Sequence, residues 1–222
     1  MCGRFSQQRP ASELSEIFAA EPLVDDLGPR YNVAPTDEAL VVVQREERRG
    51  LTAYRWGLIP HWATEAKSGS KMFNARAETL TTSPVFRDAF KRKRCLVPVD
   101  GFYEWKREGS IRQPYRITRA DGRPLALAGL WTGWRDPESG ESLRSCTIIT
   151  TSANELVAPV HDRMPVLLPR GLEDEWLDRS VPVDAALSLL RPYPAGEMTA
   201  ADASMLVNSV KNDDLRLFDP SE

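Results

Sequence analysis

The chain has 222 residues and a formal net charge of −3, with 41% apolar and 27% charged residues. This profile is typical of a globular protein with one large domain or two small ones. No apolar run approaches the ~18 residues that a membrane span needs, and the N-terminus lacks a signal-peptide core, so we expect a cytoplasmic protein with no membrane partner. The acidic balance excludes a general nucleic-acid coat, so any nucleic-acid binding must use a local basic surface.

The cysteines and histidines exclude two further classes of site. Cys2, Cys95 and Cys146 are odd in number and widely spaced, which argues against a disulfide framework. The chain has no Cys-x-x-Cys pair and only two histidines, His61 and His161. We therefore expect no zinc site, no other metal and no cofactor.

In the first part of the chain, apolar residues at helical spacing predict a helix over residues 11–20, with Ser12 as its N-cap. Residues 39–44 and 51–59 are expected as strands joined by the polar turn between them. The first part of the chain is therefore expected to contain both helix and strand.

A second helix is expected over residues 83–94, with Ser83 as its N-cap and Pro84 at its first helical position. It ends in the basic run Lys91–Arg94, which the helix dipole favours at a solvated C-terminus. A contact between this run and DNA is the alternative interpretation.

The second half of the chain is expected to form short elements. Strands are predicted over residues 95–106, 114–119, 124–131, 145–153 and 164–169, and short helices over 154–160, 172–178 and 183–190. The Asp-Gly turn at 121–122 predicts a hairpin between its flanking strands. Because no regular βαβ order appears, we expect an α+β fold with a mainly antiparallel, curved, barrel-like sheet core and short peripheral helices. One domain is expected over residues 1–222, with a tail from about residue 213.

The chain begins Met-Cys-Gly-Arg-Phe, and removal of the methionine would leave Cys2 as an N-terminal 1,2-aminothiol. An α-amino group has a pKa of about 7.7–8.0, so roughly a tenth of it is neutral at pH 7 and can form a Schiff base with an aldehyde. The adjacent thiol can then add to the imine carbon and close a thiazolidine ring. Taken alone, Cys2 is more simply a small residue at a chain end, where side chains are usually exposed. Next to it, Gly3 allows close approach of a ligand, and Arg4 can pair with phosphate.

Further polar residues lie between apolar flanks. Asn74 and Arg76 alternate as they would on one face of a strand. Glu104 lies between aromatic residues, where burial can raise its pKa and make it a proton donor. His161 and Arg163 lie in a loop between two prolines. The structural alternatives are ion pairs for the carboxylate and the arginines, and a hydrogen-bonded loop residue for the histidine.

The stretch Arg-Trp-Gly-Leu-Ile-Pro-His-Trp-Ala places Trp56 and Trp62 on either side of a proline. Exposed aromatic side chains beside a basic groove can stack on unpaired bases. Core packing is the preferred interpretation for Trp56, and stacking for Trp62.

Together these stretches resemble the SOS response-associated peptidase (SRAP) family, which includes sensors of abasic sites in single-stranded DNA. The matching segments are MCGRF, RYNVAPT, RWGLIPHWA, FNARAET, DGFYEW, QPYRI, LALAGLW, TIITTSAN, VHDRMPV and VNSVKN. They extend from residue 1 to about residue 212, so the resemblance covers nearly the whole chain.

The resemblance implies a thiazolidine DNA–protein crosslink between Cys2, as the mature N-terminus, and the ring-opened sugar of an abasic site. It implies that Asn74 orients the reacting groups, that Glu104 moves protons, and that His161 assists proton transfer. The DNA-binding residues that it implies are Arg4, Asn32, Pro35, Trp62, Arg76, Thr150 and Arg163. The expected partner is single-stranded DNA with abasic sites, bound by a monomer that associates with the nucleoid.

Two other functions remain open. Cys2, His161 and a carboxylate have the composition of a cysteine peptidase site, which would act on the Met1–Cys2 bond or on other proteins. Alternatively, Trp62 and the arginines form a single-stranded DNA-binding surface with no covalent chemistry.

Overall fold

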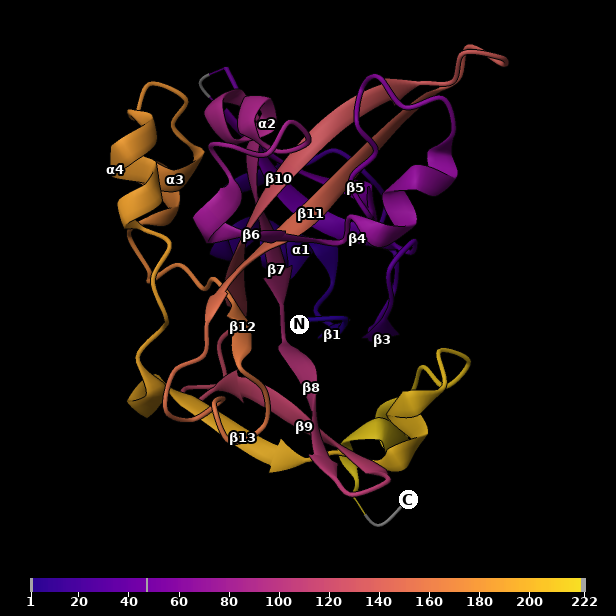
Figure 1. Cartoon of the computed structure of the whole chain (residues 1–222), viewed down its shortest axis with the longest axis vertical. Coiled ribbons are helices and arrows are strands. Elements are labelled where there is room, and N and C mark those ends of the chain that lie inside the picture. Colours follow the sequence, from indigo (N-terminus) through magenta and orange to yellow (C-terminus); the bar gives the residue numbers. More distant parts are fainter. Residues whose placement is uncertain (1, 47, 221–222) are drawn as a thin grey trace.

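The structure is a computed structural model that describes residues 2–46 and 48–220 (Figure 1). A closed barrel is formed by β4 (Glu38–Arg45), β5 (Arg48–Trp56), β7 (Arg94–Val99), β10 (Leu125–Arg135) and β11 (Ser142–Ser152). Antiparallel pairing gives the order β11-β10-β7-β4-β5, and a parallel pairing of β11 with β5 closes the ring. The predicted α+β fold with a mainly antiparallel, barrel-like core is confirmed.

A second, antiparallel sheet has the strand order β13-β9-β8-β1-β3. Its strands are β1 (Arg4–Gln7), β3 (Arg30–Val33), β8 (Gly101–Glu108), β9 (Ile111–Arg119) and β13 (Met198–Asp202). Shorter strands extend the barrel sheet, namely β2 (Ala20–Pro22) beside β5, and β6 (Asn74–Arg76) and β12 (Arg163–Pro165) beside β11. In Figure 1, β1 lies between the barrel strands above it and β8, β9 and β13 below it.

The helices are short and peripheral, as predicted. They are α1 (Ala11–Ile17), α2 (Arg87–Arg92), α3 (Glu173–Leu177) and α4 (Val183–Ser188), with the 3-10 helices η1 (Ala66–Lys71), η2 (Ala77–Thr79), η3 (Ala195–Glu197), η4 (Met205–Asn208) and η5 (Leu215–Phe218). Leu14, Phe90 and Trp176 from the helices share a buried cluster with Leu96 and Ile149 of the barrel strands. Across the described ranges, no helix is long and apolar enough to cross a membrane.

The opposite face of the strands fills the barrel interior. Val41, Trp56, Val97, Leu127 and Ile148, one from each barrel strand, belong to a second buried cluster. Successive side chains of a strand point to opposite faces. Because one face meets the interior and the other meets the helices, β4 and β11 are buried along most of their length.

Strand β1 fixes the N-terminal segment against this interior. Cys2 and Phe5 are completely buried in the interior cluster, and the Phe5 ring centroid lies 4.8 Å from that of Trp56. Burying a side chain such as Phe5 stabilises the fold by roughly 1.5–3 kcal/mol. The expectation that Cys2 is exposed at a chain end is therefore wrong.

The predicted helix starts differ from those observed. The N-cap of α1 is Pro10 and that of α2 is Phe86, and neither helix has a side-chain cap, so Ser12 and Ser83 are not N-caps. The carbonyl of Ser83 instead accepts backbone N–H groups in the turn that precedes α2.

The predicted second helix also ends earlier than expected. Arg94 begins β7 and is 4% exposed. Its guanidinium donates to the carbonyl groups of Trp176, at 2.6 Å, and Phe90, at 3.2 Å, so it joins α2 to α3 instead of ending a solvated helix.

The Asp121–Gly122 turn is present, with Gly122 at φ 72°, but it does not join a hairpin. Strand β9 pairs with β8 and β13, whereas β10 pairs with β7 and β11. A turn motif determines local geometry only, and the apolar faces of the two strands belong to different sheets.

Two further segments depart from their predictions. Residues 154–160 form consecutive turns, in which the Ala158 N–H donates to the Asn154 carbonyl, and not a helix. The segment expected as a tail is packed: Leu217 is completely buried, and the Asp213 carboxylate accepts the backbone N–H of Asn32 at 2.8 Å.

Candidate active site

Cys2 and Glu104 lie where the second sheet meets the barrel. Arg4 is paired with Tyr103 in the antiparallel β1–β8 ladder. Continuing this register by one residue brings Gly3 beside Glu104. The fold thus places the start of the chain next to a buried carboxylate.

Asn74 holds the backbone of Cys2. Its Nδ2 donates to the Cys2 carbonyl at 2.8 Å, and β6 positions it by pairing Asn74 with Ile148 of β11. The Asn74 Oδ1 is buried and has no hydrogen-bond partner within residues 2–46 and 48–220. Because buried acceptors are nearly always satisfied, this oxygen marks a place where a further donor is expected.

Burial determines the acid–base properties of the site. Glu104 is 2% exposed, and burial raises its pKa to about 7. Burial also raises the pKa of the Cys2 thiol well above its ordinary value, and the nearby charge of Glu104 adds to this effect. At neutral pH, Glu104 is therefore present in both protonation states, while Cys2 is a thiol. A carboxyl group with these properties can both donate and accept a proton.

His161 follows the loop after β11 and lines the same pocket as Glu104. Its Nδ1 accepts the Arg163 backbone N–H at 3.0 Å, which leaves the proton of the neutral ring on Nε2. Burial lowers the pKa of His161, so the neutral form dominates at pH 7.

Two adjoining pockets open at this junction, and we call them together the Cys2 groove. One is lined by Glu104, Trp105, Arg107, Arg112 and His161, and the other by Gly3, Arg4, Pro35, Phe73, Trp105, Arg112 and Asn208. The Arg4 guanidinium lies 5.9 Å from the centroid of the Trp105 ring, and the Trp105 Nε1 donates to Asn208 at 2.7 Å. Cys2 itself has no exposed surface.

Arg107 and Arg112 were not predicted as site residues. They lie directly opposite each other in the β8–β9 hairpin and line the same pocket. Neither makes an ion pair with any carboxylate whose side chain the structure describes, and like charges directly opposite in a sheet are unfavourable. The pair therefore favours an anion in the groove, and its signal in the sequence was the near-symmetric spacing of two arginines about a Gly-Ser turn.

The loop that presents Pro35 to the groove has a strained backbone. Thr36 has φ 86°, which is unusual for a β-branched residue. It is held by its N–H, which donates to the Trp56 carbonyl at 2.7 Å, and by the Asp37 carboxylate, which accepts the Ala34 N–H at 3.0 Å. Such strain is concentrated at functional sites.

Two of the predicted DNA-binding residues are buried instead. Asn32 is 1% exposed, and its amide donates to the carbonyl groups of Ser209, at 3.0 Å, and Asn212, at 2.9 Å. Thr150 is completely buried, and its carbonyl accepts a hydrogen bond from Arg163 at 2.7 Å. Both side chains therefore position neighbouring segments and do not face a surface that DNA can reach.

Three other predicted residues lie outside the groove lining. Trp62 is 58% exposed, and Arg76 is exposed on β6, two residues after Asn74. Arg163 forms a two-pronged ion pair with Glu78, at 2.6 and 3.0 Å, so its charge is already neutralised. Of the predicted residues, the structure thus brings together Cys2, Asn74, Glu104, His161, Arg4 and Pro35.

No cluster of three or more His, Cys, Asp and Glu side chains that could hold a metal ion occurs in the part of the chain that the structure describes. The three cysteines are buried and unpaired.

Comparison with known proteins agrees with this arrangement. The family model of the SOS response associated peptidase (SRAP) matches residues 1–210. The chain is 44% identical over 223 residues to the abasic site processing protein YoqW of Bacillus subtilis, with 99% of each chain covered. It is 31% identical over 227 residues to the abasic site processing protein YedK of Escherichia coli, with 99% of this chain and 100% of that protein covered.

Solved structures agree with the fold. A protein from Bacteroides thetaiotaomicron superposes with a TM-score of 0.87 at 26% identity, covering 98% of this chain and 99% of that one. A protein from Bordetella bronchiseptica superposes with a TM-score of 0.81 at 30% identity, covering 92% and 100%. The chain therefore belongs to the SRAP family.

Proposed function

We propose that this protein processes abasic sites in single-stranded DNA by forming a covalent thiazolidine between Cys2 and the opened sugar. The relatives named as abasic site processing proteins support the general role. The observation that carries the chemical proposal is the surroundings of Cys2. Asn74 holds its carbonyl, and Glu104, whose pKa burial raises to about 7, lies near enough for its charge to raise the pKa of the Cys2 thiol.

The reaction begins with hydrolysis of the Met1–Cys2 bond, which frees the α-amino group of Cys2. The neutral amine attacks the C1′ aldehyde of the ring-opened sugar, and loss of one water gives a Schiff base. The Cys2 sulfur then bonds to C1′ while the thiol proton passes to the former imine nitrogen. The net reaction after methionine removal is a condensation that releases one water.

The side chains of the site suit these proton transfers. Protonated Glu104 donates to the hydroxyl that leaves as water, and the resulting carboxylate accepts the thiol proton. The unpartnered Asn74 Oδ1 is available to accept an N–H of the reacting nitrogen. His161, neutral and lining the same pocket, assists the transfer to the opened sugar.

The cations of the groove suit the phosphates that flank the lesion. Arg4, Arg107 and Arg112 line the Cys2 groove on an otherwise acidic protein. The strained loop presents Pro35 beside them, where it can separate neighbouring bases. The exposed Trp62 ring lies beyond the groove and is available to stack on an unpaired base of the same strand.

Intact-mass analysis tests the proposal. We expect the mature protein to lack one methionine, and to gain the mass of an abasic single-stranded oligonucleotide minus one water. Methoxyamine, which blocks the aldehyde, should prevent the adduct, and undamaged DNA should give none. A heat-stable adduct formed equally well by protein that retains Met1 would refute the aminothiol mechanism.

A further inference from the structure

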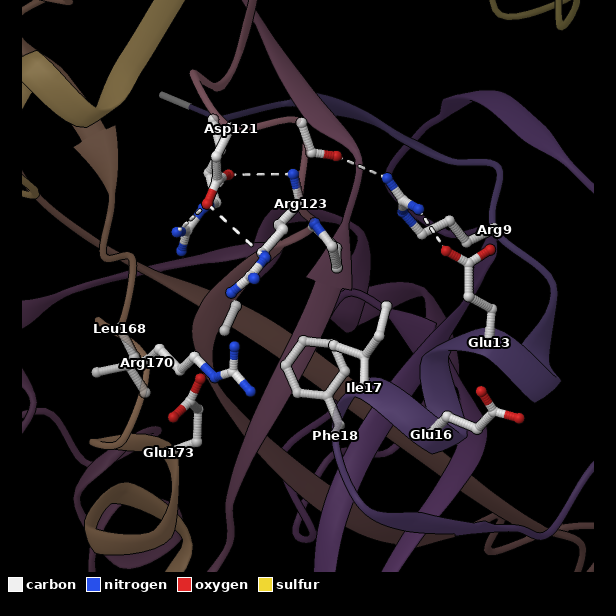
Figure 2. A pocket seen from close by; sticks show the side chains of 14 residues that line it. Arg9, Glu13, Glu16, Ile17, Phe18, Asp121, Arg123, Leu168, Arg170 and Glu173 are labelled. Carbon is white, nitrogen blue, oxygen red and sulfur yellow. Dashed lines mark hydrogen bonds and ion pairs between the residues drawn. The ribbon is translucent and has the colours of Figure 1, made fainter.

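A second concave site lies away from the Cys2 groove, between α1, the β9–β10 turn and the segment from β12 to α3. We call it the α1 pocket. Figure 2 shows the side chains that line it, namely Arg9, Glu13, Glu16, Ile17, Phe18, Arg119, Asp121, Gly122, Arg123, Pro124, Ala126, Leu168, Arg170 and Glu173. Its volume is about 430 Å³, and it shares no lining residue with the groove.

Arg9 makes one wall of this pocket rigid. Its guanidinium forms ion pairs with Glu13 of α1 and with Asp100, at 2.7 Å for the latter, and donates to the Gly122 carbonyl at 2.7 Å. One side chain thus joins α1 to the β9–β10 turn. The pocket is therefore preformed, which reduces the entropy lost on binding.

The pocket carries both signs of charge, but most of its carboxylates are already engaged. Glu13 is paired with Arg9, and both oxygens of Asp121 accept hydrogen bonds from Arg119, at 2.9 and 2.8 Å. This pairing lowers the pKa of Asp121 to about 2. Glu173 accepts the N–H of Gly171, which holds the side chain but leaves its charge, so Glu173 and Glu16 remain as charged carboxylates of the lining.

Two cations are paired more loosely. Arg123 lies only at 4.0 Å from Asp121, and Arg170 makes no ion pair with any carboxylate in the described ranges. Figure 2 shows both guanidinium groups extending into the same space beside the Phe18 ring, while Glu16 is turned away from them. Two converging guanidinium groups suit a carboxylate, which arginine binds in a two-pronged manner.

The floor between these cations is apolar. Phe18 and Leu168 are nearly buried, whereas Ile17 is 46% exposed on the same wall. A ligand that matches this surface carries a carboxylate next to a bulky apolar side chain. Folded proteins display this combination mainly in acidic peptide segments and at free C-termini.

We propose that the α1 pocket binds an acidic peptide segment of a partner protein. A carboxylate of the peptide lies between Arg123 and Arg170, and an apolar side chain packs on Ile17 and Phe18. The charge complementarity of Arg170 and the loosely paired Arg123 selects this occupant. The inference is independent of the proposed DNA chemistry, because the two sites share no residue.

Fluorescence anisotropy of the full-length protein with a labelled peptide, Asp-Glu-Asp-Leu-Phe with a free C-terminus, tests the proposal. We expect saturable binding that weakens about tenfold for each charge reversal in Arg123→Glu and Arg170→Glu. Ile17→Asp should weaken binding similarly, and so should replacing the terminal Phe of the peptide by Ala. Arg87→Glu, at an exposed arginine of α2, is the matched control and should bind like the unchanged protein.

Three results would overturn the proposal. The first is an absence of saturable binding up to about 1 mM, the weak end of specific recognition. The second is binding that survives the double variant Arg123→Glu/Arg170→Glu. The third is single-stranded DNA that displaces the peptide from the unchanged protein and whose own binding is lost in the double variant, which would make the pocket part of a DNA surface. Crosslinking to abasic DNA should be unchanged in all these variants, so failure of one proposal does not affect the other.

Discussion

The Cys2 groove and the α1 pocket use charged residues in opposite ways. In the groove, Glu104 is buried and its pKa is raised to about 7. At the α1 pocket, Asp121 is exposed, and hydrogen bonds from Arg119 lower its pKa to about 2. The first carboxyl group exchanges protons at neutral pH, whereas the second carries a constant charge.

This difference separates chemistry from recognition. Burial without full neutralisation makes a group reactive, and it destabilises the fold at that point. Pairing at the surface gives a fixed pattern of charge that a partner can match but that moves no protons. Variants of both sites test whether Glu104 exchanges protons at neutral pH and whether Asp121 keeps a constant charge.

The largest effect is expected at Cys2. Cys2→Ala keeps the amine but removes the thiol, so the stable crosslink should be lost completely, while a Schiff base that borohydride traps should remain. Denaturing gels with and without borohydride measure both species. A crosslink of Cys2→Ala that resists heat without reduction would exclude this residue as the linkage.

The second-largest effect on crosslinking is expected for Glu104→Gln. It keeps the size of the side chain and removes its proton, so the covalent step should slow by about 10²–10⁴-fold, as for loss of a general acid–base group. Affinity for an unreactive abasic analogue should stay nearly unchanged. Single-turnover crosslinking and equilibrium binding, measured in parallel, separate the two. If affinity falls in proportion to the rate, Glu104 has a structural role instead.

The sequence was sufficient to predict the barrel class and a set of candidate residues that the fold brings together. The apolar run of β4 and the β-branched run of threonine and isoleucine in β11 predicted strands, and each strand is buried on both faces. Cys2, Asn74, Glu104 and His161 were identified through their motifs, and the fold places them at one junction. Their roles in catalysis remain predictions.

The features that the sequence missed depend on contacts between distant segments. Asn32 is a polar residue that the fold uses to hold the loop after η4, and Arg94 joins two helices that lie more than 80 residues apart. The turn at Asp121 and Gly122 gave no information about which sheet each flanking strand would join. A local sequence pattern cannot indicate which hydrogen-bond partner a polar side chain takes or which sheet a strand joins, because the partner segment is distant in sequence.

The same Glu104→Gln variant should also be more stable than the unchanged protein at high pH. Because the pKa of Glu104 is raised on folding, the folded state holds this proton more tightly than the unfolded state does. The resulting contribution to stability is fully present below about pH 4.5, and it is lost as pH rises through 7. At pH 8 the ionised carboxylate costs roughly 3 kcal/mol, and the glutamine avoids this cost. Thermal melts at pH 4 and pH 8 should show a gain only at pH 8. An equal gain at both values would indicate that burial does not raise the pKa.

Arg112→Ala should have a smaller effect, confined to DNA affinity. Each phosphate neutralised contributes about −0.7 to the slope of log affinity against log salt for single strands. Loss of one contact should therefore flatten the slope by about that amount and leave the rate of the covalent step unchanged at saturating DNA. Arg76→Ala, outside the groove lining, is the comparison, and a contact there was also predicted from the sequence. A change for Arg76 without one for Arg112 would place the DNA path along β6 instead of through the groove.

The smallest effect is expected for Asp121→Asn at the α1 pocket. Loss of this carboxylate releases Arg119 and leaves Arg123 without its distant counter-charge. Exposed pairs of this kind are weak, so binding of the acidic peptide should strengthen by only roughly two- to threefold. Because the lowered pKa of Asp121 keeps it ionised above about pH 4, the gain should be the same at pH 5 and pH 8, whereas crosslinking should not respond at either. Anisotropy titrations at both pH values measure the gain in peptide affinity. A gain that appears only at pH 8 would show that Asp121 titrates near neutrality. Asp121 would then not carry a constant charge, and the two sites would no longer differ in this respect.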